Sequence, residues 1–253
     1  MPDRQTIFQR TELLLGRTVT AAMHRQRVLM VGVGGVGSWC AESLVRSGIG
    51  HLTLVDMDVV CESNVNRQLM ATQSTIGQPK AEVLRKRLLD INPTADIVAR
   101  CMAYDENTAG EFCLDDYDYV IDAIDTLKSK ALLICRACES TATLFSSMGA
   151  ALKLDPHRIR VAEFWKVEGD PLARTLRKRF KREGTFPARK FQCVYSDERL
   201  QNAEAQPQAE GGQAERRPNG TVAHITAIFG FTLASLVVRD VAARTTAASA
   251  ENG

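Results

Sequence analysis

A group of basic and amide side chains in the first third of the chain could act on a phosphate group. Arg67 lies in a polar segment, and Lys80 opens the next expected helix. Two cations that converge on the phosphate end of a nucleotide suit a triphosphate that is to be cleaved, because negative charge builds up on the leaving pyrophosphate. A nicotinamide cofactor has no such need, so this pair favours nucleotidyl transfer over hydride transfer.

A glycine-rich turn precedes these residues. The apolar run 28–31 leads into Gly32-Val33-Gly34-Gly35-Val36-Gly37, a helical pattern follows, and a second apolar run, 52–55, ends on Asp56. This order of strand, turn, helix, strand and acid is half of a dinucleotide-binding unit. The glycines let the backbone approach a phosphate, the helix N-terminus offers it N–H groups, and Asp56 can bind ribose hydroxyls. The turn alone would suit an NAD-dependent oxidoreductase equally well.

A later apolar run, 119–121, predicts a buried parallel strand that ends on a pair of aspartates. Asp122 and Asp125 follow it directly. Ligands of open α/β sheets bind at the carboxyl ends of the strands. One of these two carboxylates is therefore expected to meet the Mg²⁺ that accompanies ATP.

These motifs, in this order, resemble the adenylation domain of the ubiquitin-activating-enzyme-like superfamily (ThiF/MoeB type). The similar stretches are the glycine turn, Asp56-Met57-Asp58, the segment 63–68, the segment 77–80 and the segment 120–125. Within the superfamily the sequence is most similar to the tRNA threonylcarbamoyladenosine dehydratases, over nearly the whole chain. The resemblance implies an α/β, Rossmann-like fold. Its sheet is mostly parallel with helices on both faces, and a smaller C-terminal, substrate-facing part has antiparallel strands.

The resemblance also implies a set of site residues. Those expected to bind ATP are Gly32, Gly34, Gly35, Gly37, Asp56, Asp58, Ser63, Asn64, Asn66, Arg67, Gln68, Lys80, Asp125 and Thr126. Those expected to act in catalysis are Arg10, Asn64, Arg67, Lys80 and Asp125. Family position favours Asp125 as the Mg²⁺ ligand, with Asp122 as a structural residue. Arg10 is expected to reach the ATP site of a partner subunit, which requires a homodimer.

For the dehydratases, the family implies that the activated carboxylate belongs to N6-threonylcarbamoyladenosine at position 37 of tRNA. The carboxylate attacks the α-phosphate, pyrophosphate leaves, and the arm's own atoms then close a ring with loss of AMP. The net change is the loss of water. Because the attacking group is already part of the substrate, no nucleophile from the enzyme is required.

The residues divide the chain into four expected parts. Residues 1–27 form a helical arm for dimer contact, and residues 28–150 form the ATP-binding core. Residues 151–243 carry the substrate-facing strands, a basic helix, a flexible insertion at 200–218 and a C-terminal packing helix. Residues 244–253 are expected to be a disordered tail. The apolar stretch 222–241 is long enough to suggest a membrane span, but its polar interruptions favour a core or dimer-interface helix.

The net charge of the whole chain, +2, indicates little about partners, but the distribution of charge along the chain is informative. Eight basic residues and one acid lie between Leu172 and Lys190, on a helix whose apolar edge is Leu172, Leu176 and Phe180. Such a cationic face fits an RNA backbone. The residues expected to contact tRNA are Arg174, Arg177, Lys178 and Lys181. For the charge run alone, a solvated surface helix remains the alternative.

The seven cysteines argue for a reduced, cytoplasmic protein, since the N-terminus carries no signal peptide. Cys135 and Cys138 form one CxxC pair without the second pair that a structural zinc site needs, so both are predicted to pack in a helix. Cys193 is also predicted to pack rather than react. The alternative functions are activation of a ubiquitin-like sulfur-carrier protein and a scaffold that helps a cysteine desulfurase. Binding of a sulfur-transfer or cysteine desulfurase partner is left as an open alternative.

Overall fold

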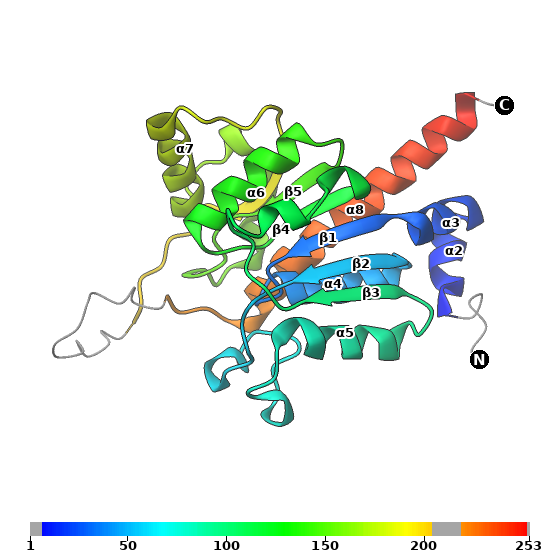
Figure 1. The fold of residues 1–253 in the computed structure, drawn as a ribbon, viewed down its shortest axis with the longest axis horizontal. Helices are drawn as coiled ribbons and strands as arrows, with labels where there is room; N and C mark the ends of the chain where they lie inside the picture. The colour runs from blue at the N-terminus through cyan, green and yellow to red at the C-terminus, as the bar shows by residue number, and fades with distance from the viewer. Residues whose placement is uncertain (1–6, 204–218, 252–253) are drawn as a thin grey trace.

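The computed structural model describes residues 7–203 and 219–251. Seven strands form one sheet in the order β3-β2-β1-β4-β5-β7-β6 (Figure 1). The strands are β1 Arg27–Val31, β2 His51–Val55, β3 Asp96–Arg100, β4 Tyr119–Asp122, β5 Thr143–Ser147, β6 Ile159–Glu163 and β7 Gln192–Ser196. The helices are α2 Gln9–Leu15, α3 Arg17–Arg25, α4 Gly37–Ser47, α5 Lys80–Ile91, α6 Leu127–Glu139, α7 Pro171–Glu183 and α8 Ala223–Glu251.

Both faces of the sheet are covered by helices. Val28 and Met30 of β1 join the core formed with α3, α4, α5 and α8, whereas Leu29 and Val31 join the core formed with α6 and α7. Successive residues of a strand point to opposite faces, so a strand covered on both sides reads as a continuous apolar run. This confirms the α/β fold predicted from the runs 28–31, 52–55 and 119–121.

The sheet places the predicted site residues at one edge. Strand β1 pairs in parallel with both β2 and β4, so all three end at the same edge. The strand order proceeds outward from β1 to β3 and then resumes on the other side with β4. Ligands of such sheets bind outside the carboxyl ends of the strands at this switch point. The glycine turn follows β1 at this edge.

The predicted antiparallel strands continue the same sheet. β7 pairs in parallel with β5, and β6 pairs with β7 in antiparallel fashion. The part predicted to face the substrate is therefore built on the same sheet as the glycine turn.

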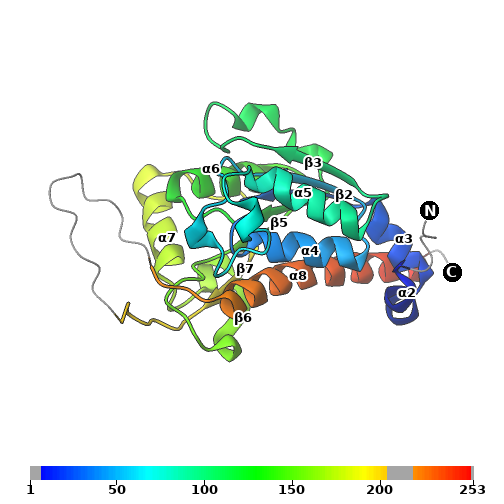
Figure 2. The ribbon, with the colours of Figure 1, turned by 90° about the horizontal axis from the view of Figure 1, so that it is seen from below.

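Helix α8 lies along α4, as Figure 2 shows. Its residues Ile225, Phe229, Leu233 and Val237 are buried. Gly230 permits close contact, because a Cβ there would lie 2.8 Å from the backbone nitrogen of Cys40 and 2.9 Å from the Cβ of Trp39. By length and composition α8 could cross a membrane, with a mean hydropathy of 1.6, yet 44% of its most apolar window is buried inside the protein. The burial of this apolar face agrees with the predicted packing helix.

The prediction of a disordered tail from residue 244 is wrong as far as residue 251. Helix α8 continues to Glu251, and Arg244 forms an ion pair of 2.8 Å with Asp240 one turn earlier. The segment is rich in alanine, which has the highest helix propensity, so extending an existing helix costs little. The predicted flexible insertion lies outside the described residues over 204–218.

The N-terminal arm contains the short helices α2 and α3, as predicted. Phe8 is buried and lies close to Gly48 at the C-terminal end of α4. Within the described helix α2 no side chain is buried, and Leu13 and Leu14 are largely exposed. The arm therefore packs at the end of α4 that is remote from the glycine turn.

Candidate nucleotide site

Two positions of the glycine turn, Gly32 and Gly37, have no room for a side chain. Gly32 has φ of +86°, and a Cβ on it would lie 2.6 Å from the carbonyl oxygen of Ala123. A Cβ on Gly37 would overlap the carbonyl oxygen of Gly32. The turn thus brings the backbone after β1 against the loop after β4, and only glycine fits at these two positions.

Asp56 fixes the geometry of this turn. One of its carboxylate oxygens accepts a hydrogen bond of 2.8 Å from the Val33 N–H, and the other accepts one of 2.9 Å from the Asp58 N–H. Burial raises the pKa of Asp56 more than these two donors and the nearby Lys80 lower it. Each oxygen retains a lone pair. Asp56 therefore fixes the conformation of the glycine turn.

Lys80 is buried at the start of α5, with its charged end beside Asp58. The Nζ to Oδ2 distance is 2.7 Å, and the side chains are 7% and 53% exposed, respectively. The backbone N–H of Lys80 also donates to the Asp58 carbonyl at 2.9 Å. The ammonium is thus held just beyond the C-terminal end of β2. Its partner, the Asp58 carboxylate, is also accessible to solvent.

The polar segment between β2 and α5 is held together by its own side chains. Asn64 is buried, and its Oδ1 accepts a hydrogen bond from the Cys61 N–H. The guanidinium of Arg67 donates to the Ser63 carbonyl and to Asn66 Oδ1, both at 2.9 Å. Gln68 is buried, and its Oε1 has no hydrogen-bond partner among residues 7–203 and 219–251. A Cβ on Gly34 would lie 3.6 Å from Gln68 Nε2, so this amide borders the glycine turn.

The two aspartates after β4 have different surroundings. Asp122 is fully buried and contacts Lys130 at 2.7 Å and Ser146 Oγ at 2.6 Å, which agrees with the predicted structural role. Asp125 is exposed, as is Thr126. Since Gly32 packs against Ala123 and Ile124, Asp125 lies beside the glycine turn. One exposed carboxylate next to a phosphate turn suits Mg²⁺, which takes one or two carboxylates and completes its shell with phosphate oxygens and water.

Several residues that support the site were not predicted. Lys130 is fully buried and donates to the Ile124 carbonyl as well as to Asp122. Trp39 donates its indole N–H to the Arg67 carbonyl at 3.1 Å. Thr226 at the start of α8 packs its methyl group against Gly35. For Lys130 the sequence did hold a signal, since it is in helical register with the apolar Ile134 and Cys138.

The basic helix α7 forms as predicted, with Ala173, Leu176 and Phe180 buried. Arg174, Lys178 and Lys181 are exposed and make no ion pair within the described part of the chain. Arg177 differs, because its guanidinium donates to the Phe164 carbonyl at 2.9 Å. The structure therefore leaves three of the four predicted tRNA-contacting side chains free for a ligand.

Arg10 lies far from the nucleotide site of its own chain. It is exposed on α2, which packs near the C-terminal end of α4, whereas the glycine turn is at the N-terminal end. Helix α4 has 11 residues, which corresponds to about 16 Å at about 1.5 Å per residue. An arginine side chain cannot span that length, so Arg10 does not join the other predicted site residues within one chain.

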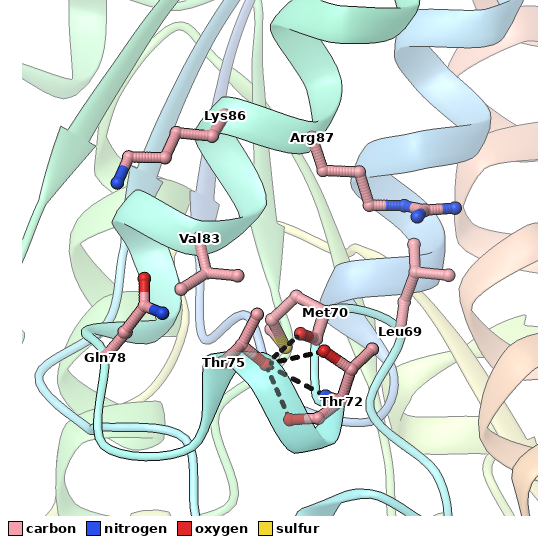
Figure 3. A pocket seen from close by; sticks show the side chains of 8 residues that line it. All are labelled: Leu69, Met70, Thr72, Thr75, Gln78, Val83, Lys86 and Arg87. Carbon is pink, nitrogen blue, oxygen red and sulfur yellow. Dashed lines mark hydrogen bonds between the residues drawn. The ribbon is translucent and has the colours of Figure 1, made fainter.

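A separate pocket of about 280 Å³ lies between the segment 69–78 and α5 (Figure 3). Lys86 and Arg87 line it from α5, and their side chains point in opposite directions. The Thr75 hydroxyl donates to the Met70 and Thr72 carbonyls, so it is already engaged. The lining residues include none of those assigned to ATP. This pocket therefore borders the polar segment without being the nucleotide site.

Cys193 is buried and Cys135 is half-buried. Among the described residues there is no group of three or more His, Cys, Asp or Glu side chains that could hold a metal ion. Burial raises the pKa of Cys135 to about 11 and the pKa of Cys193 well above its ordinary value. Both thiols are therefore protonated at neutral pH, in agreement with the predicted packing roles.

The chain belongs to the ThiF family, whose sequence pattern matches residues 8–252. It is 38% identical over 240 residues to the tRNA threonylcarbamoyladenosine dehydratase of Bacillus subtilis (strain 168), covering 92% of this chain and 94% of that protein. The Escherichia coli (strain K12) protein of the same name is 34% identical over 255 residues, with 94% of each covered.

Solved structures of the E. coli tRNA N6-threonylcarbamoyladenosine dehydratase are similar in fold. The complex with AMP aligns with a TM-score of 0.83 at 34% identity over 96% of each chain. The complex with ATP aligns with a TM-score of 0.84 at 32% identity. A molybdopterin-synthase adenylyltransferase of E. coli is 32% identical, but over only 63% of this chain. The two bacterial dehydratases thus match more than nine-tenths of this chain, whereas that adenylyltransferase matches 63% of it.

Proposed function

We propose that this protein is an ATP-dependent adenylating enzyme that dehydrates N6-threonylcarbamoyladenosine in tRNA. The observation that carries the proposal is the placement of Lys80 and Arg67 at the edge of the sheet beside a phosphate turn, in a chain that matches dehydratases over more than nine-tenths of its length. The reaction transfers AMP to the threonyl carboxylate and releases pyrophosphate. Ring closure within the substrate then expels AMP.

The residues around the turn divide the work on ATP. The turn and the N-terminus of α4 receive the phosphates, because free N–H groups and the helix dipole favour an anion there. Asp56 accepts hydrogen bonds from the ribose. Lys80 and Arg67 stabilise the charge that grows on the phosphates as the α-phosphorus is attacked. Asn64, buried below them, keeps the segment that carries Arg67 in place.

Asp125 would hold Mg²⁺ beside the phosphates. The ion supplies neutralisation of phosphate charge when it is bound. The side chain of Asp125 is exposed next to the turn, whereas Asp122 is committed to Lys130 and Ser146. Of the two carboxylates, only that of Asp125 is open to such an ion.

Ring closure needs no nucleophile from the protein. The attacking atom belongs to the same arm as the activated carbonyl, which gives it a high effective molarity. Cys193 cannot compete, since its thiol is buried and protonated. The protein would then contribute by holding the arm close to the α-phosphate and by excluding water.

We further propose that the enzyme works in the cytoplasm as a homodimer, in which Arg10 of one subunit completes the ATP site of the other. Two observations support this: Arg10 is too far from its own site, and the exposed Leu13 and Leu14 on the same helix offer an apolar contact. Mixing Arg10→Ala with Lys80→Ala protein is expected to restore up to a quarter of wild-type activity, from heterodimers with one intact site. A mixture no more active than the two separate variants would exclude a shared site.

The assay for the main proposal uses purified protein, ATP, Mg²⁺ and tRNA that carries the threonylcarbamoyl modification. Nucleosides from the digested tRNA are weighed by mass spectrometry, and the expected product is lighter by one water. Omission of ATP and the Lys80→Ala variant are the controls. If the tRNA stays unchanged while ATP–pyrophosphate exchange depends on an added ubiquitin-like carrier protein, the chain is instead a carrier-protein adenylyltransferase.

A further inference from the structure

Two aromatic side chains beside the basic helix are exposed to solvent. Trp165 is 38% exposed and Phe186 is 51% exposed. Their ring centroids are 6.2 Å apart with the planes inclined at 40°. Trp165 belongs to the turn after β6, and Phe186 follows the C-terminal end of α7, so two separate segments bring these rings together.

Trp165 packs against a cluster of buried aromatic side chains. The ring of Phe164 lies 5.1 Å from that of Trp165, 5.9 Å from that of Phe180 and 5.0 Å from that of Phe191. Phe164 itself is fully buried. The Trp165 ring therefore rests on a buried aromatic residue and would lose little conformational entropy on binding a flat partner, while Phe186 contacts Trp165 from the side of α7.

A stripe of positive charge runs alongside. Arg174, Arg177, Lys178 and Lys181 occupy positions i, i+3, i+4 and i+7 of α7, which lie on one side of a helix. Arg177 marks which side this is, because it donates to the Phe164 carbonyl and lies 5.7 Å from the centre of the Phe164 ring. The cationic stripe thus borders the turn that carries Trp165.

This surface is connected to the candidate site. Helix α7 is capped by Asp170, whose Oδ1 accepts from the Ala173 N–H at 2.8 Å. A Cβ on Gly149, just after β5, would lie 3.5 Å from Asp170 Oδ2. Helix α7 therefore begins near the carboxyl edge of the sheet, and its 13 residues span about 20 Å.

We propose that Trp165 and Phe186 form a stacking platform for an unpaired base of the RNA substrate, outside the site that holds the reacting nucleotide. This inference rests on the proposed function. Sequence-tolerant RNA binding combines cationic side chains that follow the backbone with aromatic rings on which unstacked bases lie. Rigid exposed rings beside three free cations supply both, which favours a single-stranded nucleic acid over an apolar protein surface.

The test measures binding of an unmodified anticodon stem-loop RNA, with a fully paired RNA of equal length as the second probe. Stacking contributes about 1–3 kcal/mol per base, so Trp165→Ala is expected to weaken stem-loop binding roughly 5- to 150-fold and duplex binding far less. Trp165→Tyr retains a ring and is expected to stay near wild type. Val98→Ala, an exposed apolar position on the opposite edge strand, serves as the control.

The salt dependence of RNA binding separates the contribution of stacking from that of electrostatic contacts. The slope of log K against log salt is expected to be unchanged in Trp165→Ala and reduced by about 1 in Lys178→Ala. With the full modified tRNA, Trp165→Ala is expected to raise KM and leave kcat near the wild-type value. If wild type dehydrates the tRNA while Trp165→Ala keeps both its KM and its stem-loop affinity, the platform is refuted and the proposed function stands. If wild type does not dehydrate it, the function itself fails.

Discussion

Two lysine–aspartate ion pairs at the same edge of the sheet have equal distances between their charged atoms. One pair is accessible to solvent, whereas the other is buried. The Lys80–Asp58 and Lys130–Asp122 contacts are both 2.7 Å. The Asp58 side chain is 53% exposed, whereas Lys130 and Asp122 are both 0% exposed. The first pair follows β2 at the glycine turn, and the second joins the end of β4 to α6.

The difference shows how one kind of contact serves function in one place and structure in another. The Asp58 carboxylate can be solvated when Lys80 turns to another anion, because its side chain is 53% exposed. Lys130 has no such freedom, since Asp122 also binds Ser146 and the Ile124 N–H in a dry interior. Loss of one partner should therefore damage chemistry at the first pair and folding at the second.

The largest expected effect is on folding. Lys130→Met leaves the buried Asp122 without its counter-charge and is expected to cost about 3–5 kcal/mol of unfolding free energy. Urea denaturation measures it. Lys128→Met on the same helix is the matched control, because Lys128 and its partner Glu106 are both well exposed. Adding Asp122→Leu to Lys130→Met is expected to recover much of the loss; no recovery would mean that the single-variant effect is not an unpaired charge.

The second effect is on chemistry. Lys80→Met is expected to lower kcat about 10²- to 10³-fold, because one donor to the developing phosphate charge is removed. Its stability is expected to change by at most about 1 kcal/mol, as for a solvent-accessible ion pair. Pyrophosphate release measures the rate. Lys86→Met, on the same helix and exposed, is the control. A Lys80→Met enzyme with normal kcat would remove Lys80 from the chemistry.

A third, half-buried ion pair predicts a smaller effect with a pH signature. Glu42 contacts Arg46 at 2.9 Å and Arg87 at 2.5 Å. Burial raises the pKa of Glu42, but hydrogen bonds from Arg87 and Arg46 outweigh it, so the pKa is lowered overall. A lowered carboxyl pKa stabilises the fold above the unfolded-state pKa, and this contribution disappears as pH falls through the folded-state pKa.

Glu42→Gln is therefore expected to cost about 1–3 kcal/mol at pH 7. The difference from wild type should begin to shrink as pH falls below the unfolded-state pKa of about 4.3, and it should disappear once folded wild-type Glu42 takes up a proton. Thermal unfolding at several pH values checks this. Glu82→Gln is the control, since its partner Arg85 is 3.8 Å away and both side chains are well exposed. A difference that stays constant down to low pH would exclude an electrostatic cause.

The sequence was sufficient for the nucleotide side of the fold because that side is encoded locally. The glycine turn, the apolar runs around it and Asp56 are contiguous, and each has a steric or electrostatic reason to be where it is. The lack of room for a Cβ at Gly32 and Gly37 is one such steric reason.

Other features depend on contacts between distant segments, which local patterns do not reveal. The helical register places Lys130 on the apolar face of α6, but its pairing with Asp122 depends on where β4 ends relative to that helix. The engagement of Arg177 with the Phe164 carbonyl required the position of the turn after β6. The helical end of α8 was missed because its alanine-rich sequence lacks an apolar stripe, although alanine itself favours the helix.

The contact of α8 with the glycine turn has a consequence for synthesis of the chain. Thr226 and Gly230 pack against Gly35 and the first turn of α4, although nearly the whole chain separates these segments. A ribosome delivers the N-terminal elements first. A nascent polypeptide therefore lacks one wall of the glycine turn until α8 has emerged from the ribosome and packed against α4.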